Sequence, residues 1–512
     1  VVIMGKGKRG GRPARTQDPF NVHVSRADEA LSNVSEALMN FSKAHHHSGY
    51  TSAHLGNPDC TSTKFYAAID NLMTIQRRGG GIAKPKELSA CIPPFLNWLE
   101  ANGMDLKKFP IELRTDLTEG CGLILTEDIK EKEKFLQVPQ ELIMSTHTAD
   151  LAGIQQIKAE PIHKMPSVKL AVFLLLEKHS STKSFWKEYI DVLPRSLSLP
   201  LFWKPEEILA LKGTSIYGQT LQQQANTMMQ YLHIRKAFQE QRKKDLTMFT
   251  YEEYRWAVGI IMSRQNYVPV DNTPQIGLIP LWDMLNHDEG TMTTFYSQED
   301  AETQCFAMRD FKKDEQMFIY YGERANAMLL LFQGFFFDRN ALKLFTFHHE
   351  VLNPADKFKA AKEVFFMKHH LNAKNLTIYA TGDVSQWKSM VALRNSFADI
   401  TEFKKQNALE DPTGQELSLA NEVAAVDQFL AAVAAIREWK VEQYVPFSAD
   451  ESLHFSFANS LREEEDETLA RGTELLQAYR TKLRKRERRA KQRSNKKTKQ
   501  EQQKILESAC DD

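Results

Sequence analysis

The chain has 512 residues, 42% of them hydrophobic, and its 66 basic and 66 acidic side chains leave no net charge. This length is enough for two or three domains. Apolar runs such as Leu170–Leu176 are far too short to cross a bilayer. Five cysteines without a Cys-x-x-Cys pair argue against a disulfide framework or a zinc site. We therefore expect a cytoplasmic protein, with the nucleus as a second location, that has no membrane partner and no metal.

The neutral total hides a strong segregation of charge. Residues 1–15 carry five basic and no acidic side chains, and residues 480–499 carry twelve basic side chains and one acidic. Residues 500–512 contribute −3, which leaves −13 on residues 16–479. An acidic body does not predict a protein that binds nucleic acid over its whole surface. The basic tail, residues 481–512, could still act as a nuclear signal or contact RNA, or be a solvated helix.

The first 80 residues predict a disordered and helical segment. Residues 1–22 are rich in Gly, Arg and Pro and have almost nothing to bury, which predicts disorder. Short amphipathic helices are expected at 26–43 and 64–77, and Gly79–Gly81 marks a hinge.

Strand and helix signals then alternate in blocks. Short strands and turns are expected over 113–138, helices from Met165 to about Phe249, and strands again over 278–321. The pattern predicts an α+β fold in which a helical block, about 140–250, interrupts a strand-rich domain.

After Phe337 the pattern becomes helical. Between Asn421 and Lys440 apolar residues recur every three or four positions, the stripe of a buried amphipathic helix. A further helix is expected over Ser460–Arg480, because the acidic run at 463–467 favours a helix N-terminus.

Three short motifs indicate the chemistry. The turn Glu119-Gly120-Cys121-Gly122 comes first, then Asn286-His287, and 34 residues later Tyr320-Tyr321-Gly322. Closely spaced glycines let a backbone approach a ligand, the Asn286 amide offers donors and acceptors, and Tyr321 places a polar tip on an aromatic wall. Each residue alone is more often a turn or packing residue, but the three in this order indicate one site.

Longer segments surround these motifs. They are residues 119–139, 185–194, 251–269, 278–287 and 321–338, and they include Arg264-Gln265-Asn266 and Trp282-Asp283-Met284-Leu285-Asn286-His287. Together they resemble the SET-domain actin-histidine N-methyltransferases, relatives of the plastid Rubisco lysine methyltransferases. The resemblance covers roughly residues 85–480. It implies transfer of a methyl group from S-adenosylmethionine to the tele nitrogen of a histidine in actin, by a monomeric enzyme.

The resemblance also implies a domain order. Residues 81–337 would form a SET-domain β-fold with the inserted helical subdomain. Residues 338–480 would form an all-helical substrate-binding domain of the Rubisco-methyltransferase type, followed by the basic tail.

Site residues are carried over from the resemblance position by position. Those expected to bind the cofactor are Lys86, Glu119, Gly120, Cys121, Arg264, Asp283, Met284, Leu285, Asn286, His287, Gln333, Gly334 and Phe335. Those expected to contact the substrate are Gln265, Asn266, Trp282, Ile319, Tyr321 and Arg324. Tyr321 and Asn266 are the expected catalytic residues, and no metal ligand is implied.

A histidine acceptor also makes chemical sense. Lysine, with a pKa near 10.4, must first lose a proton, whereas histidine, near 6.5, is largely neutral at physiological pH. The enzyme must then hold the ring N–H so that the lone pair faces the methyl group. A side-chain carbonyl of Asn266 or Gln265 could do this, and Trp282 offers a flat wall for the ring. The alternative for Gln265 and Asn266 is that they only cap a helix ending before Pro269.

Two other functions stay open. One is a protein-lysine N-methyltransferase acting on another, non-histone protein; Asn266 and Trp282 argue against it, because a lysine site favours an aromatic residue at position 266. The other is a non-catalytic scaffold that binds nucleic acid through its basic ends. The intact Arg264, Asn286, His287 and Tyr321 argue against a loss of activity.

Overall fold

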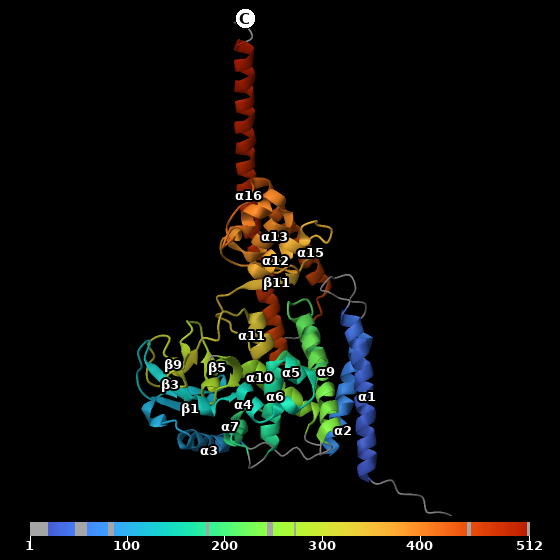
Figure 1. The fold of residues 1–512 in the computed structure, drawn as a ribbon, viewed down its shortest axis with the longest axis vertical. Helices are drawn as coiled ribbons and strands as arrows, with labels where there is room; N and C mark the ends of the chain where they lie inside the picture. The colour runs from blue at the N-terminus through green and yellow to red at the C-terminus, as the bar shows by residue number, and fades with distance from the viewer. Residues whose placement is uncertain are drawn as a thin grey trace, which may run out of the picture.

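The computed structural model describes residues 19–46, 59–79, 87–180, 184–242, 249–270, 273–447 and 452–508. Figure 1 shows a large lower body of strands and helices, a smaller upper unit, and a long C-terminal helix that passes through the upper unit and projects beyond it. Most of the segment predicted to be disordered, and two of the three hinge glycines, lie outside the described residues. The first described helix already begins at Pro19.

The lower body contains three small sheets. The first has the order β1-β2-β10-β7. Its strands are β1 (Ile111–Leu117), β2 (Gly120–Leu125), β7 (Asn286–His287) and β10 (Gln316–Ile319). The second and third sheets have the orders β3-β9-β8 and β4-β6-β5. Their strands are β3 (Lys134–Pro139), β4 (Met144–Ser145), β5 (Asn266–Val270), β6 (Thr273–Leu278), β8 (Thr294–Ser297) and β9 (Glu302–Phe306). The predicted strand-rich halves are therefore both present.

The helical block between these halves is longer than predicted. It comprises α4 (Thr146–Leu151), α5 (Glu160–Lys164), α6 (Pro166–His179), α7 (Lys187–Val192), α8 (Pro205–Ala210), α9 (Tyr217–Arg242) and α10 (Tyr251–Arg264). We expected helices to about Phe249, but α10 continues to Arg264 because Thr250 caps its N-terminus by accepting from the Glu253 N–H. Helix α10 packs against α6 and buries Tyr254, Ala257 and Ile261 in the main core.

The N-terminal helices belong to the lower body. Helices α1 (Pro19–His46) and α2 (Asp59–Gly79) pack on each other, and α1 also packs against α9, as Figure 1 shows. They exceed the predicted ranges 26–43 and 64–77. The Tyr66 hydroxyl donates to Gln224 at 2.7 Å, and Gln76 donates to the Tyr231 hydroxyl at the same distance. Helix α3 (Leu88–Ala101) then leads into β1.

The upper unit corrects one prediction, because it is not all-helical. Strands β11 (Leu344–His348) and β12 (Asn375–Tyr379) form an antiparallel pair. Alternation of buried and half-buried residues in β11, such as Phe345 and Phe347 inside, is a strand period that we did not read. Helices α13 (Lys388–Phe397) and α16 (Leu453–Ser508) pack on this pair. Helices α12 (Lys359–Lys368), α14 (Ile400–Asn407) and α15 (Leu419–Glu442) contribute to the same hydrophobic cluster, while α11 (Asn326–Gln333) leads toward the pair from the lower body.

The predicted stripe of α15 packs on a second hydrophobic cluster that the upper unit forms: Val426 and Val433 are buried in it, and Val423, Leu430 and Ile436 lie half-buried against it. Ala425 and Phe429, outside the predicted stripe, complete the buried face. By length and mean hydropathy alone, α15 is the one described helix that could cross a membrane. These buried contacts show that the apolar face of α15 is used in packing.

The last helix, α16 (Leu453–Ser508), has 56 residues. We expected a helix start at the acidic run 463–467, but this run lies about three to four turns inside the helix. Its members are used as partners instead: buried Glu465 accepts from Ser215 and from Lys440, and Glu464 accepts from Asn326. The acidic residues therefore join the lower body to the upper unit.

Candidate active site

The two halves of the central motif lie on adjacent parallel strands. Strand β7 pairs with β10 so that Asn286 is opposite Phe318 and His287 is opposite Ile319. Tyr321 follows β10 directly, and its N–H donates to His287 Nδ1 at 3.2 Å. Residues 34 positions apart in the sequence are thus brought into direct contact.

The glycine turn reaches the same place from the other side of the sheet. Strand β2 lies between β1 and β10, and the Asn286 amide donates to the Cys121 carbonyl at 2.9 Å. Gly120 has φ +93°, a conformation that favours glycine. A Cβ on Gly122 would lie 2.9 Å from Asn286 Nδ2, so only glycine permits this approach. The motif glycines are required by the geometry.

His287 is a structural part of this arrangement. Its ring packs against Tyr321 and Phe337, with centroids 5.1 and 5.0 Å away. Burial lowers the pKa of His287 below its ordinary value. Because Nδ1 accepts from the Tyr321 N–H, the neutral ring carries its proton on Nε2. We infer that His287 supports Tyr321 and is not an acid or base.

Tyr321 is fixed at both ends. Its hydroxyl donates to the Leu285 carbonyl at 2.7 Å. Burial raises the pKa of Tyr321 to about 12, so the phenol stays protonated at neutral pH. It can therefore act as a hydrogen-bond donor and a wall, but not as a general base.

Behind the motif lies a buried polar group that the sequence did not reveal. Tyr189 of α7 donates its hydroxyl to Asp283 Oδ2, and Arg264 Nη1 donates to the Asp283 carbonyl. Burial raises the pKa of the Asp283 carboxyl. Among the described residues, Asp283 Oδ1 and Arg264 Nε have no hydrogen-bond partner, and the distance of 4.0 Å between Arg264 Nη1 and Asp283 Oδ1 is too long for one. Such buried unsatisfied groups are typical of ligand sites.

A cavity of about 640 Å³ opens in front of these residues. Predicted site residues that line it are Arg264, Gln265, Asn266, Trp282, Asp283, Leu285, Tyr321, Arg324 and Gln333. The structure therefore brings most of the predicted substrate residues to one cavity, together with part of the predicted cofactor set.

Asn266 and Gln265 differ in what they can offer to a ligand. Gln265 accepts from the Ser167 hydroxyl at 2.8 Å, which occupies its carbonyl oxygen. Asn266 donates through Nδ2 to the Arg264 carbonyl at 3.0 Å, which leaves Oδ1 as an acceptor. Gln265 is the C-cap residue of α10, and the bond from Asn266 Nδ2 satisfies the carbonyl of Arg264, the last residue of that helix, so both residues also cap the helix end as the alternative expected. Of the two amide oxygens, that of Asn266 accepts no hydrogen bond within the described residues, so it is the more available acceptor in the cavity.

The cavity has an aromatic wall and an apolar mouth. Trp282 is 8% exposed, and its indole N–H donates to Thr294 at 3.1 Å, which fixes the ring. Tyr267, Met292 and Phe295 also line the cavity and are exposed, Tyr267 by 82%. Exposed apolar side chains around a cavity indicate a surface that binds a partner.

The segment at the end of α11 closes one side. In the orientation that satisfies its neighbours, Gln333 accepts from Arg324 Nη1 and donates to the Met328 carbonyl. Gly334 has φ +82°, and a Cβ there would lie 2.9 Å from the Leu199 backbone N. Phe335 packs 6.1 Å from the His287 ring.

Other predicted residues lie elsewhere. Ile319 is buried in the core and does not line the cavity, and Met284 is also a core residue. Glu119 is exposed at the glycine turn. Lys86 lies outside the described residues. Residues that sequence reasoning missed are Tyr189, Ser167 and Thr294, because each acts through a side-chain contact with a residue 12 to 98 positions away, which no local pattern shows.

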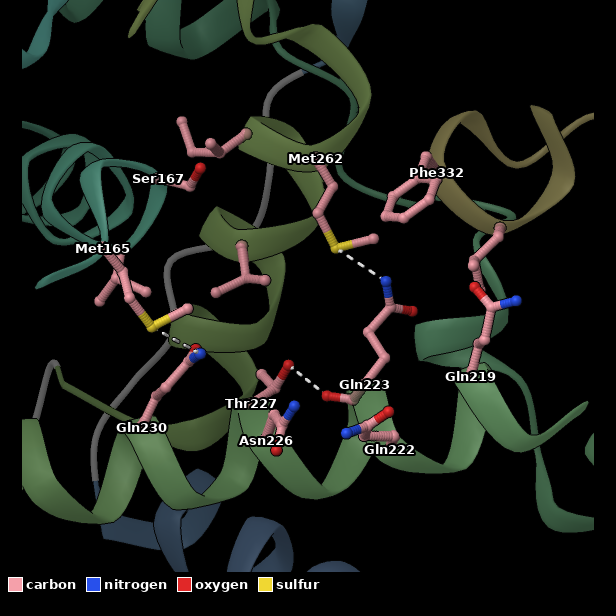
Figure 2. A pocket seen from close by; sticks show the side chains of 14 residues that line it. Met165, Ser167, Gln219, Gln222, Gln223, Asn226, Thr227, Gln230, Met262 and Phe332 are labelled. Carbon is pink, nitrogen blue, oxygen red and sulfur yellow. Dashed lines mark hydrogen bonds between the residues drawn. The ribbon is translucent and has the colours of Figure 1, made fainter. Parts of the chain in front are cut away.

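A second, smaller hollow of about 300 Å³ adjoins the cavity. Figure 2 shows a row of polar side chains from α9, with Met262 and Phe332 above them. Met262 and Phe332 line both hollows. The row consists of Gln219, Gln222, Gln223, Asn226, Thr227 and Gln230. Gln223 Oε1 is buried without a hydrogen-bond partner, so this amide row retains acceptors and donors for a polar chain.

Comparison with known proteins places residues 120–322 in the SET domain family. Over 257 residues the chain is 38% identical to the actin-histidine N-methyltransferases of Homo sapiens and Mus musculus. This alignment covers 49% of the chain and 43% of those proteins, so the chain matches less than half the length of these curated relatives.

Solved structures show the same fold. The SET domain of LSMT bound to lysine and AdoHcy aligns with a TM-score of 0.61 at 21% identity, over 78% of this chain and 95% of that one. Rubisco LSMT bound to AdoMet aligns with a TM-score of 0.58, also at 21% identity, over 78% and 96%. The strand pairing, the motif contacts and these similarities agree that residues 120–322, which match the SET domain model, have the SET-domain fold.

Proposed function

We propose that the chain is an S-adenosylmethionine-dependent protein-histidine N-methyltransferase whose substrate is actin. The observation that carries the proposal is the free Asn266 Oδ1 in a cavity that also contains Trp282 and Tyr321. The name of the curated relatives supports the choice of acceptor and of actin.

The cofactor proposal rests on the glycine turn. S-adenosylmethionine would supply a methyl group on a sulfonium. Gly122 lets the Asn286 side chain lie directly against the turn, Asn286 and the turn offer backbone and amide groups, and Asp283 Oδ1 has no hydrogen-bond partner among the described residues. These groups fit a ligand with amino, carboxylate and adenine ends.

The proposal that the acceptor is a histidine rests on the different roles of its two ring nitrogens: one is held by a hydrogen bond, and the other receives the methyl group. Asn266 Oδ1 would accept the N–H of the pros nitrogen, which leaves the lone pair of the tele nitrogen directed into the cavity. Trp282 would pack against the ring. Tyr321 stays protonated, since burial raises its pKa to about 12, and cannot remove a proton from the acceptor. A neutral imidazole needs no such base before transfer.

The substrate is proposed to be a protein segment and not a small molecule. The exposed Tyr267, Met292 and Phe295 surround the mouth, and the amide row of α9 continues from it (Figure 2). An extended chain could place one histidine in the cavity and pair its backbone with the amide row. We further propose a monomeric enzyme in the cytoplasm, with a nuclear fraction.

The test is methyl transfer from isotopically labelled cofactor to purified actin, with the labelled residue mapped by mass spectrometry. Wild type and the control Asn372→Ala, in an exposed loop of the upper unit, should label one histidine. Asn266→Ala should reduce the rate at least tenfold, which is about 1.4 kcal/mol of transition-state stabilisation. Label on a lysine, or full activity of Asn266→Ala, would replace the histidine proposal with the lysine enzyme.

A further inference from the structure

The last helix continues far beyond the part that packs. Leu483 is the last buried residue of α16, and residues 484–501 are exposed apart from half-buried Glu487. Figure 1 shows this part of α16 projecting from the upper unit into solvent. Residues 484–499, here called the basic helix, carry ten basic side chains and one acidic one.

Most of this charge is not neutralised by the protein. Arg484 and Arg486 pair with Asp427 and Glu416 of the upper unit, at 3.8 and 2.7 Å. Lys491 pairs with Glu487 within the helix, at 3.0 Å. Within the described ranges the other seven have no acidic partner. They are Lys485, Arg488, Arg489, Arg493, Lys496, Lys497 and Lys499.

The arrangement of the charges excludes two common partners. Ala490 is the only apolar residue of the basic helix, so it has no face to insert into a membrane or an apolar groove. At 100° per residue, the basic side chains from Lys485 to Lys499 cover an arc of about 240° of the helix circumference. A flat acidic surface could contact only part of such an arc.

We propose that the basic helix binds double-stranded DNA by lying in the major groove. Phosphates line both walls of this groove, which is about 12 Å wide and admits an α-helix. A wide arc of cations can face both walls at once, as in the continuous basic helices of dimeric DNA-binding proteins. Lys485 to Lys499 span about 21 Å, or roughly six base pairs.

The geometry favours DNA over duplex RNA, whose A-form major groove is deep and narrow and does not admit side chains for reading. The projection of the basic helix also keeps the rest of the molecule away from the DNA phosphates. Residues 16–479 carry −13, which would be repelled by phosphates. The projecting helix separates this acidic body from the site of binding. This binding would not depend on methyl transfer.

The experiment is fluorescence anisotropy of the full chain with a labelled 20-base-pair DNA duplex across a salt series. Micromolar binding is expected at low salt, with log K falling by about 0.9 per phosphate contact for each unit of log salt. The test variant neutralises four cations of the basic helix: Arg488→Gln, Arg489→Gln, Arg493→Gln and Lys496→Gln. It should bind at least tenfold more weakly, and its salt slope should fall by about three to four.

The matched control removes the same charge from exposed lysines of the upper unit. Its substitutions are Lys357→Gln, Lys368→Gln, Lys388→Gln and Lys405→Gln. It should keep the wild-type affinity and slope. Equal affinities of the two variants would overturn the proposal. So would tighter binding of duplex RNA or of poly-glutamate than of the DNA duplex, since these would indicate an RNA partner or an acidic protein.

Discussion

Each part of the molecule contains a buried carboxylate next to an arginine and a tyrosine: Glu422 in the upper unit and Asp283 in the lower body. The two differ in how many hydrogen bonds their oxygens accept. Glu422 in the upper unit accepts two hydrogen bonds from Arg394, at 2.6 and 2.8 Å, and one from Tyr479 at 2.7 Å. Asp283 in the SET domain accepts one from Tyr189, and its Oδ1 has none.

The difference separates a structural group from a site group. Glu422 joins α13, α15 and α16, and both of its oxygens have partners without a ligand, although Nη1 of Arg394 has no partner among the described residues. Asp283 lies behind the cavity, its carboxyl has a raised pKa because of burial, and one oxygen remains available. A buried polar group without a partner lowers the stability of the fold, and proteins keep such groups where binding or catalysis requires them.

The largest loss of stability is expected from removing the Glu422 carboxylate, which accepts hydrogen bonds from Arg394 and Tyr479. Glu422→Ala leaves the buried Arg394 without its counter-ion, which should cost about 3–5 kcal/mol of unfolding free energy. Urea unfolding followed by tryptophan fluorescence would measure it. A loss below 1 kcal/mol would mean that water replaces the pair and that Glu422 does not hold the three helices.

Next in size is Asn286→Ala, which acts on the site and not on the core. The Asn286 amide bonds the Cys121 carbonyl, so its removal should loosen the glycine turn and weaken binding of S-adenosylhomocysteine at least a hundredfold, or about 2.7 kcal/mol. Titration calorimetry measures the affinity, and the urea midpoint should remain close to wild type. Unchanged affinity would contradict the assignment of the turn as the cofactor site.

The sequence allowed much of the site to be predicted because its motifs are local. Asn286, His287 and Tyr321 meet as expected, since parallel pairing of β7 and β10 follows from the SET fold. From the sequence alone, Asn266 could be proposed only as one of two amides, with Gln265, that could accept the N–H of the substrate ring. The Ser167–Gln265 bond that distinguishes them joins positions 98 residues apart, and no local pattern predicts such a contact.

Predictions on the upper unit were less complete. The stripe of α15 was readable because its period of three to four repeats over many turns. Strands β11 and β12 were missed because each has five residues, too few for alternation to stand out among helices. The acidic run 463–467 was misread as a helix start because its partners, Ser215, Lys440 and Asn326, are known only from tertiary structure.

A third test replaces the acceptor group of the cavity. Asn266→Phe removes Oδ1 and leaves the N–H of a bound imidazole unpaired, a cost of about 1–3 kcal/mol. Histidine transfer to an actin peptide should fall roughly ten- to hundredfold. Wild-type transfer should be nearly flat above neutral pH, whereas a lysine-substituted peptide should react faster as pH rises. Wild type preferring the lysine peptide would contradict the histidine assignment.

Asp283→Asn should change how stability depends on pH. A raised native pKa means that the folded state holds the Asp283 proton more tightly than the unfolded chain. Stability from this group is therefore present below the unfolded pKa, near 3.9, and is lost as pH rises through the native pKa.

Relative to Asp283→Asn, wild type should thus lose stability as pH rises above about 4, by about 1.4 kcal/mol for each unit by which the pKa is raised. Urea titrations of both proteins at several pH values give this difference, and other carboxylates cancel in it. If the unfolding free energy of wild type instead rises relative to that of the variant as pH rises, Asp283 is held as a stabilised anion, like a carboxylate whose oxygens both have partners.

The smallest effect on stability and activity is expected from a change that leaves Glu422, Asp283 and their partners in place. Truncation after Arg486 keeps buried Leu483, the Tyr479–Glu422 bond and the Arg486–Glu416 pair. Removal of residues 481–512 would instead delete Leu483 and expose the end of the second core. The shorter truncation should therefore change unfolding free energy by less than about 0.5 kcal/mol, the usual range for surface changes, and leave methyl transfer within about twofold. A greater loss of transfer with unchanged unfolding would show that the projecting helix also holds the protein substrate.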